Sequence, residues 1–447
     1  MNGSLRSGRV IALVVTLCVV AALVFYQTPH TLSTSPWSRP PPPPPQQHAP
    51  GADVRPPLPP DHVVDHLPPE HKADAESSLK CTLFPDTGKL AIAVKTGATE
   101  AVERIPILML TTLQCAKNVM IFSDLEQDIA GHHLHDALAD IPESAMQDNT
   151  DFDFYRHLKE ADKLGEIEQM LRGAKDPRMP GDLAAWTLDK YKQLHILEKM
   201  YAKYPDKAWY MMVDADTYVV WPNVLTWLDK LPDPFANKLS GIFISHAAMH
   251  EFAGTGEHLA AKWDKPMHDE CCGDYVIGLE LKNHGIPLKP SWPTVNGEKP
   301  VTLPFGPTHW CEPVVTMHHV APNEMSQLSN YELSRNDTSS PMTFADLFRA
   351  FTGNVVPDSL PDWDNYSQDK QVDAESYAAC QQLCEDDKKC FQFAHQGKEC
   401  RLGYSIHLGE PRASDQSMKR QSGWLKQRIE TWVQSRGPCE PKFPWTK

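Results

Sequence analysis

The sequence predicts an α/β fold with a largely parallel sheet, followed by a small disulfide-rich C-terminal module. Short apolar runs alternate with helical patterns through the middle of the chain, which is typical of α/β sandwiches. Cysteines then cluster near the C-terminus, four of them from Cys380 to Cys400. A chain of 447 residues is long enough for one large domain or two smaller ones, each with its own core.

The charge of the chain excludes one class of function. Its formal net charge is -15, whereas general nucleic-acid binders hold phosphate backbones with clustered lysine and arginine. We therefore expect no nucleic-acid partner, and any anionic ligand must be held by a local group of residues.

The N-terminal segment predicts a membrane anchor. Arg6 and Arg9 precede the uncharged apolar run Val10 to Tyr26, which is near the lower limit for spanning a bilayer. Basic residues before such a run favour a cytosolic N-terminus. The alternative is a cleaved signal peptide, although "VVAALVF" has no clear Ala-x-Ala site. We expect a cytosolic tail over 1–9, a signal anchor over 10–26 and an extended proline-rich stalk over 27–80.

Cysteine usage agrees with a lumenal body. Of the eleven cysteines, Cys18 lies in the predicted anchor, and the ten that follow form an even set suited to disulfides in an oxidising compartment. A zinc site is the alternative for the closely spaced group. The sequons at Asn336 and Asn365 would be glycosylation acceptors in the same compartment.

Four apolar runs have the length and content of buried strands: Leu90 to Val94, Asn118 to Asp124, Trp209 to Asp214 and Gly241 to Ser245. The segment Asp182 to Tyr204 carries apolar residues at roughly helical spacing, and Pro205 ends this predicted helix. In open sheets of this kind, ligands bind beyond the carboxyl ends of the strands. Asp214 and Asp216 fall at such an end.

Two interpretations fit Asp214 and Asp216. On spacing alone, a structural role is favoured, either in a turn or as a cap for a helix that begins near Pro222. An Asp-x-Asp pair can also hold a hard divalent cation, because Mn2+ and Mg2+ bind carboxylate, water and phosphate oxygens together. Such a cation would bridge the protein to a diphosphate.

The segment "VDADTYVVWPNVLTWL" resembles the Asp-Asp-Asp-Thr-Tyr-Val strand end of the family 31 glycosyltransferases, which include core 1 β-1,3-galactosyltransferase and Fringe. Three further segments follow the family's order, namely "LAIAVKTGATEAVERIPILMLTTLQCAKNVMIFSD", "WTLDKYKQLHILEKM" and "ECCGDYVIGLELKNHG". A fourth segment, "VVTMHHV", is similar to the family's late histidine-containing strand. The resemblance spans Leu90 to Tyr331 and is greatest to a fungal-type branch of the core 1-like enzymes.

This resemblance implies a GT-A fold over 81–355 and an inverting, metal-dependent reaction. The enzyme would move galactose, with N-acetylglucosamine as the alternative, from its UDP donor to a hydroxyl of a glycan or glycoprotein acceptor. It would be a single-pass type II protein of the Golgi or another secretory-pathway membrane, with its catalytic domain in the lumen.

The resemblance also implies roles for individual residues. Asp216 would bind Mn2+, with Mg2+ as the alternative, and Asp214 would lie toward the ribose or a metal-bound water. His318 would be the later metal ligand, because a neutral imidazole suits such an ion, and His319 is the fallback. Ala215 replaces the middle aspartate of the family motif.

Asp274 corresponds to the family's proposed catalytic base, which would take the proton of the acceptor hydroxyl. A cap of the predicted helix Tyr275 to Asn283 is the alternative role, and both can hold. By the same resemblance, further residues would contact the donor: Thr96 and Asp124 at the uridine and ribose, Lys192 near the diphosphate, and Arg104 as a weaker candidate. For a lysine on an amphipathic helix, a solvated face is the default.

One segment departs from the family. After the Asp-x-Asp helix, the family has a short strand and a loop reading about Phe-Ala-His-Gly-Gly, which lead to the acceptor pocket. Here "LPDPFANKLSGIFISHAAM" runs straight into Ser240 and Gly241, so we expect that strand and loop to be missing, either in the protein or through an error in the reading frame. The alternative function is therefore a transferase-like nucleotide- or glycan-binding protein that is impaired in transfer.

The C-terminal segment "YAACQQLCEDDKKCFQFAHQGKECRLG" resembles a PAN/Apple-like module, which we place over 356–447. The resemblance implies the pairs Cys384 with Cys390 and Cys380 with Cys400. Such modules commonly bind protein or carbohydrate, so this one would help to present the acceptor; a packed structural appendage is the alternative. Zinc would instead need free thiolates or a closed tetrahedral set.

Overall fold

The computed structural model describes residues 81, 84–165, 180–239, 241–335, 340–412 and 419–446. The predicted tail, anchor and stalk lie outside these residues, as do the sequon asparagine Asn336 and Ser240. A search of the described helices found none that is long and apolar enough to cross a membrane.

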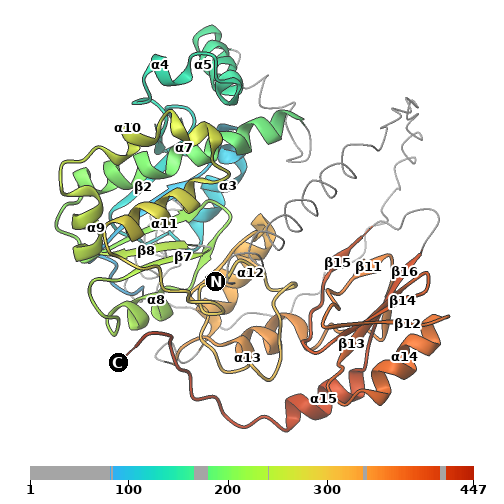
Figure 1. Cartoon of the computed structure of the whole chain (residues 1–447). Coiled ribbons are helices and arrows are strands. Elements are labelled where there is room, and N and C mark those ends of the chain that lie inside the picture. The colour runs from blue at the N-terminus through green and yellow to red at the C-terminus, as the bar shows by residue number, and fades with distance from the viewer. Residues whose placement is uncertain are drawn as a thin grey trace, which may run out of the picture. The chain divides into compact units, whose positions relative to one another are not determined.

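A seven-stranded mixed sheet lies at the centre of the first domain, in the order β3-β4-β2-β1-β5-β8-β7 (Figure 1). The four central strands are mutually parallel, namely β4 (His132–Asp136), β2 (Val119–Ser123), β1 (Leu90–Lys95) and β5 (Trp209–Asp214). Three flanking strands make antiparallel pairs, namely β3 (Gln127–Ile129) with β4, β8 (Gly241–Ser245) with β5, and β7 (Ala236–Leu239) with β8. The prediction of an α/β fold with a largely parallel sheet is confirmed.

All four predicted strands form, because each is an apolar run buried on both faces of the sheet. Side chains alternate across the sheet, and β1 therefore contributes to two separate cores. Leu90, Ile92 and Val94 pack in the core that also contains residues of α3, α8 and α12. Ala91 and Ala93 pack in the core that also contains residues of α7, α9 and α11. The sheet is thus covered by helices on both faces.

The helices of this domain are α3 (Ala98–Leu110), α4 (Glu143–Met146), α5 (Asp153–Leu164), α7 (Pro180–Lys203), α8 (Trp221–Leu228), α9 (His246–Ala253), α10 (Leu259–Trp263), α11 (Gly273–Asn283), α12 (Pro322–Ser334) and α13 (Phe344–Leu347). The predicted long helix corresponds to α7, which ends two residues before Pro205 because proline cannot continue the hydrogen-bond ladder. The predicted helix near Pro222 is α8. Short 3-10 and π-type turns lie at Thr150–Phe152, Pro266–Asp269 and Phe348–Thr352.

The expectation that the strand before Ser240 is missing is wrong. Strand β7 pairs antiparallel with β8, and Leu239 lies opposite Gly241 in their register. Gly241 has a φ of +136°, a conformation that favours glycine at such a close turn. In the sequence, the single residue Ser240 separates the two strands.

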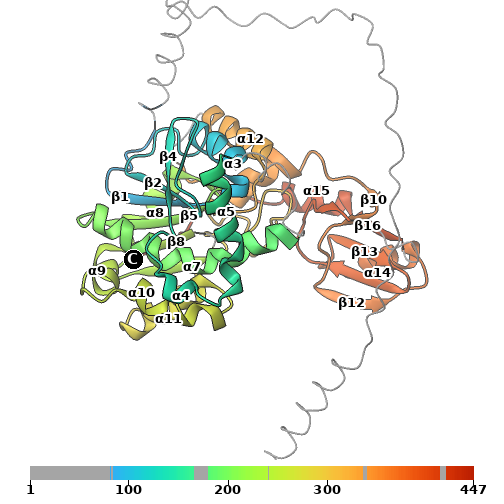
Figure 2. The ribbon, with the colours of Figure 1, turned by 90° about the horizontal axis from the view of Figure 1, so that it is seen from above.

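The C-terminal module contains a five-stranded antiparallel sheet in the order β10-β16-β13-β14-β12, with α14 against β13 (Figure 2). Its strands are β10 (Ser359–Pro361), β12 (Lys370–Asp373), β13 (Gln392–Gln396), β14 (Glu399–Gly403) and β16 (Arg420–Trp424), and its helices are α14 (Tyr377–Asp386) and α15 (Lys426–Gln434). Strands β11 (Trp363–Asp364) and β15 (Glu410–Pro411) form a separate pair. The boundary at 355 and 356 stays a prediction.

All ten described cysteines are paired. In the C-terminal module Cys380 bonds to Cys400 and Cys384 to Cys390, the two pairs that the resemblance implies. The others join Cys81 to Cys115, Cys271 to Cys272 and Cys311 to Cys439. These bonds leave no free thiolate among the described residues, which rules out the zinc alternative for the closely spaced group.

The structure contradicts Asn365 as a glycosylation site. Its side chain is fully buried, and the Nδ2 group donates to the carbonyl oxygens of Phe393 at 3.1 Å and Gly423 at 3.3 Å. A glycan on Nδ2 has no room at this position and would remove both hydrogen bonds. The three-residue motif carries no information on burial, which is why the sequence could not exclude it.

Candidate metal centre at the carboxyl end of the sheet

Two segments far apart in the sequence meet beyond the end of β5. Asp216 follows this strand by two residues, and the short strand β6 (Tyr218–Val219) then pairs antiparallel with β9 (Thr316–Met317). In this antiparallel register Tyr218 lies opposite Met317. Two residues further along the same register, Asp216 lies opposite His319. The pairing of β6 with β9 therefore positions the late histidines beside the Asp-x-Asp segment.

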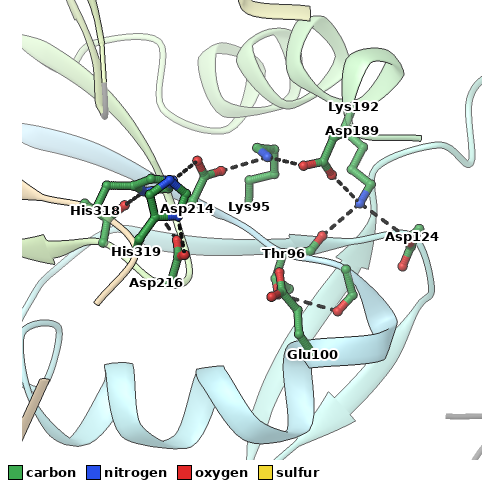
Figure 3. Close-up of polar contacts among 12 residues, drawn as sticks. Lys95, Thr96, Glu100, Asp124, Asp189, Lys192, Asp214, Asp216, His318 and His319 are labelled. Carbon is green, nitrogen blue, oxygen red and sulfur yellow. Dashed lines mark hydrogen bonds and ion pairs between the residues drawn. The ribbon is translucent and has the colours of Figure 1, made fainter. Parts of the chain in front are cut away.

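Asp216, His318 and His319 offer ligand atoms that all lie within 4.8 Å of one another (Figure 3). One carboxylate oxygen of Asp216 lies 3.3 Å from Nδ1 of His318, and the other lies 3.5 Å from Nδ1 of His319. Oδ2 of Asp214 lies 3.8 Å from Nε2 of His318. The structure thus brings together the three predicted metal-site residues and the fallback histidine.

The backbone holds this group in place. The amide of Val320 donates to the carbonyl oxygen of Asp216 at 3.0 Å, and Oγ1 of Thr217 lies 2.9 Å from Nδ1 of His318. His319 has a φ of 58°, a left-handed conformation that is uncommon outside glycine and costs about 1–3 kcal/mol. Its side chain is 70% exposed, whereas that of His318 is only 15% exposed. The imidazole of His318 therefore lies in the interior of the site, and that of His319 lies at its solvent-exposed edge.

The electrostatics of the site favour a carboxylate at its centre. Burial alone would raise the pKa of Asp216, but the hydrogen bond with His319 and the charges of His318 and Arg104 lower it below its usual value. Burial lowers the pKa of His318. The hydrogen bond to Asp216 raises the pKa of His319. The carboxylate of Asp216 and the imidazole of His318 are a donor pair that fits Mn2+ and other divalent ions.

A chain of buried and partly buried charges leads from Asp214 into the protein (Figure 3). Nζ of Lys95, at the end of β1, lies 2.7 Å from Asp214 and 2.5 Å from Asp189 on α7. Burial alone would lower the pKa of Lys95, but the two carboxylates raise it. They keep this lysine charged, and one oxygen of Asp214 is therefore already neutralised by the protein.

Lys192 continues the chain, and the alternative of a solvated position is wrong, whereas its predicted contact with the diphosphate stays a prediction. Its side chain is fully buried, and Nζ lies 2.8 Å from Asp189, 3.5 Å from Asp124 and 2.9 Å from the carbonyl oxygen of Thr96. Burial alone would raise the pKa of Asp189, whereas Lys192 and Lys95 lower it to about 2. The ammonium of Lys192 is shielded from solvent here, so it supports the strand ends rather than lining an open surface.

The other predicted donor residues lie around this chain. Oδ1 of Asp124 accepts a hydrogen bond of 2.6 Å from the amide of Ala98, at the start of α3. Thr96 is buried at the end of β1. Arg104 on α3 has a partly buried side chain that donates to the carbonyl oxygen of Val320 at 3.1 Å, and its charge acts on Asp216. Arg104 is thus the predicted basic residue that faces the metal group.

Asp274 lies in the first turn of α11, which begins at Gly273 with Cys272 as its N-cap residue. The alternative role of Asp274 as a helix cap is wrong, because α11 begins at Gly273, one residue before Asp274. A Cβ at Gly273 would lie 2.5 Å from the carbonyl oxygen of Lys190, so this turn of α11 packs directly on α7. This contact lies on α7 one residue from Asp189. Lys95 joins Asp189 to Asp214 through two ion pairs.

Three residues of the site were missed from the sequence: Lys95, Asp189 and Glu100. Lys95 directly follows a predicted strand, and Asp189 precedes Lys192 by three residues on one helix. A strand-end position and an i,i+3 spacing were therefore visible in the sequence as signals for these two residues. Glu100 is half-exposed and accepts a hydrogen bond of 3.4 Å from Thr96, and burial together with Asp216 raises its pKa.

No protein-family model matches the chain, and a search of curated proteins found no significant match. The resemblance to the family 31 glycosyltransferases therefore depends on the sequence segments quoted above.

Proposed function

We propose that this protein is a metal-dependent, inverting glycosyltransferase with a GT-A fold, which moves galactose from UDP-galactose to a glycan acceptor in β-1,3 linkage. The observation that carries the proposal is the meeting of Asp216, His318 and His319 beyond the carboxyl end of the central strand β5. Open α/β sheets bind their ligands at this edge. The carboxylate pair and the late histidine come from the segments that resemble the family.

Mn2+ fits the donor set, because a carboxylate and imidazoles can share such an ion with diphosphate oxygens. Asp216, His318 and His319 would hold it, and once bound it would stabilise the negative charge of the departing UDP. Lys95 already neutralises one oxygen of Asp214 at 2.7 Å, which leaves the other oxygen for the ribose or a water. Arg104 supplies a further positive charge on the same side.

Asp274 would act as the general base. Its carboxylate takes the proton of the acceptor hydroxyl while that oxygen attacks the anomeric carbon and the bond from that carbon to the diphosphate breaks. The contact of Gly273 with Lys190 supports this role, since it brings the first turn of α11 against the part of α7 that carries Asp189. One carboxylate suffices for inversion.

The direct connection of β7 to β8 favours a second candidate function. The family has an acceptor-side loop here, whereas only Ser240 separates these strands. The donor half of the site does not depend on that loop. The alternative is therefore a protein that binds the nucleotide or a glycan without efficient transfer.

Titration of the purified full chain with UDP, with and without Mn2+, tests the donor half. We expect Mn2+ to increase UDP affinity by about tenfold or more and Asp216→Asn to abolish that increase. Asp229→Asn is the matched control, because Asp229 is an exposed partner of Lys89. Equal Mn2+ dependence in the wild type and Asp216→Asn would refute the metal site.

The transfer step needs a separate measurement. Galactose transfer is compared among this chain, a chain with a family-like loop inserted between Leu239 and Ser240, and that chain carrying Asp274→Asn. We expect the last change to reduce transfer by roughly two to four orders of magnitude with UDP affinity within a few fold. Full transfer in the repaired Asp274→Asn chain excludes Asp274 as the base. Mn2+-dependent UDP binding without transfer in any chain favours the binding protein.

We further propose that the protein is anchored in a secretory-pathway membrane with its body in the lumen. Five disulfides support this location, because such bonds persist in oxidising compartments. Protease protection of the body in sealed microsomes is the expected result. A secreted form that begins shortly after Tyr26 would show a cleaved signal peptide instead.

A further inference from the structure

A second group of histidine and carboxylate side chains lies on the hairpin of β3 and β4. Ligand atoms of Glu126, His133 and His135 all lie within 4.8 Å of one another. This hairpin forms one edge of the sheet, and β2 and β1 separate it from β5. The group is therefore distinct from the one around Asp216, and the proposed transfer reaction does not use it.

The hairpin register explains why these side chains meet. His133 lies opposite Asp128, and Leu134 lies opposite Gln127. Because side chains alternate along a strand, His133 and His135 share one face while the fully buried Leu134 points to the other. One further step of the same register sets Glu126 opposite His135.

The distances suit a shared metal ion. Oε1 of Glu126 lies 2.7 Å from Nε2 of His133 and 3.7 Å from Nδ1 of His135. Two ligands of a tetrahedral zinc ion, each at about 2.1 Å from the metal, lie roughly 3.4 Å apart, which falls between these two separations. Small rotations of exposed side chains are enough to admit the ion. The side chains are between 39% and 51% exposed, so an ion can enter from solvent.

A second layer of hydrogen bonds already orients the candidate ligands. Oδ1 of Asp128 lies 3.0 Å from Nδ1 of His133, which directs Nε2 toward Glu126. The amide of Asp136 donates to Oε2 of Glu126 at 2.7 Å, which leaves Oε1 for the histidines. Metal-binding histidines commonly pair their other ring nitrogen with a carboxylate in this way.

We propose that Glu126, His133 and His135 bind a divalent transition-metal ion of the Zn2+ class, with Asp128 as a positioning residue. Two imidazoles and one carboxylate are the donors that Zn2+, Ni2+ and Cu2+ share, and they suit Mg2+ and Ca2+ poorly. Three protein ligands leave a fourth position for water. Bound metal would join β3 to β4 and stabilise the sheet edge that follows Asp124.

Zinc alone is the probe, and the other metal group must first be removed. The full chain carrying His318→Gln and His319→Gln is freed of metal with a chelator and titrated with Zn2+ by calorimetry. We expect one equivalent to bind, and we expect His133→Gln with His135→Gln to weaken binding by more than about a hundredfold. His132→Gln is the matched control, since His132 lies on the same strand but shares its face with Leu134. Its Zn2+ affinity should stay within a few fold.

Two further variants test the layers of the site. Glu126→Gln should weaken Zn2+ binding because it removes a ligand. Asp128→Asn should weaken Zn2+ binding by about 10- to 100-fold without changing the stoichiometry. Co2+ in place of Zn2+ gives visible absorption bands that report tetrahedral ligation, and we expect the double histidine change to remove them. Unchanged bands or unchanged Zn2+ affinity after that change overturns the proposal, as does the absence of Zn2+ binding in the starting chain.

Discussion

Nζ of Lys95 lies 2.7 Å from a carboxylate oxygen of Asp214, and on its other side it lies 2.5 Å from Asp189. The same Asp189 contacts Lys192, which reaches Asp124 at the end of β2. Charges of alternating sign therefore connect the ends of three neighbouring parallel strands. Lys95 neutralises Asp214 from within the protein, and Asp216 is the aspartate of the pair whose charge acts more strongly on both histidines.

Replacement of Lys95 by methionine should destabilise the fold strongly. The change keeps most of the side-chain volume but leaves Asp189 and Asp214 without this partner, and breaking a buried pair in this way costs about 3–5 kcal/mol. The measurement is the shift in the urea unfolding midpoint of the full chain with its disulfides intact. Lys89→Met is the control, since the Lys89–Asp229 pair is exposed and such pairs contribute about 0–1 kcal/mol. Equal shifts for both variants would contradict a structural role for Lys95.

Glu332 should make stability depend on pH. Burial raises the pKa of its carboxyl group to about 7, although the hydroxyl of Tyr218 donates to it at 2.7 Å. The folded chain therefore binds a proton at this carboxyl group more tightly than the unfolded chain does. The group's contribution to the free energy of unfolding is present below its unfolded pKa and is lost as pH rises toward about 7. We expect Glu332→Gln to stabilise the protein at about pH 8 by roughly 1–2 kcal/mol, allowing for partial solvent screening.

This gain should shrink as the pH falls toward about 5, where the wild-type carboxyl group is protonated in the folded chain. Thermal unfolding midpoints across this pH range provide the measurement. Glu430→Gln on the exposed face of α15 is the control and should change little at any pH. A pH-independent effect of Glu332→Gln would show that the carboxyl group titrates normally.

The strands could be predicted from the sequence, whereas the site could be predicted only in part. Runs such as Leu90 to Val94 are apolar throughout, and that composition determines a buried strand almost by itself. The short pair β6 and β9 has no such signal, because each strand has two residues and depends on a partner far along the chain. The late histidines were reached through family resemblance rather than through any local pattern.

The buried lysines show a second limit of the sequence. A lysine on an amphipathic helix is normally solvated, but Lys192 is fully buried because Asp124 and Asp189 compensate its charge. Those partners come from a strand end and a helix turn, and only the tertiary fold brings them together. The strand β7 was missed for a similar reason, since "ANKL" contains polar residues and is defined by its pairing with β8.

Gly273 should tolerate no side chain. A Cβ there would lie 2.5 Å from the carbonyl oxygen of Lys190 and 3.1 Å from the side chain of Gln193, so α11 must move away from α7. We expect Gly273→Ala to destabilise the chain by about 1–3 kcal/mol and to reduce transfer, because Asp274 moves with the helix. Gly437→Ala is the control, since a Cβ at Gly437 meets nothing within 4 Å. If Gly273→Ala matched Gly437→Ala in unfolding midpoint and transfer rate, α11 and α7 would separate without a loss of stability.

Asn365 should matter for stability and not for glycosylation. Asn365→Ala removes two hydrogen bonds from buried carbonyl oxygens, and such losses cost about 1–3 kcal/mol. Asn354→Ala replaces an exposed asparagine and should leave the unfolding midpoint unchanged. Mass spectrometry of the peptide that contains Asn365, from protein made in a eukaryotic secretory pathway, should find the unmodified residue. A glycan there would contradict the burial of this side chain.

The bond between Cys311 and Cys439 closes a covalent ring of the polypeptide that contains the whole of α12, α13, α14 and α15. A protease that cuts once anywhere from 312 to 438 therefore opens the ring without releasing a piece. Such a nicked molecule keeps its full mass on a non-reducing gel and separates into fragments only after reduction. A chain cleaved in its C-terminal module would consequently stay attached to its sheet domain for as long as its surroundings remain oxidising.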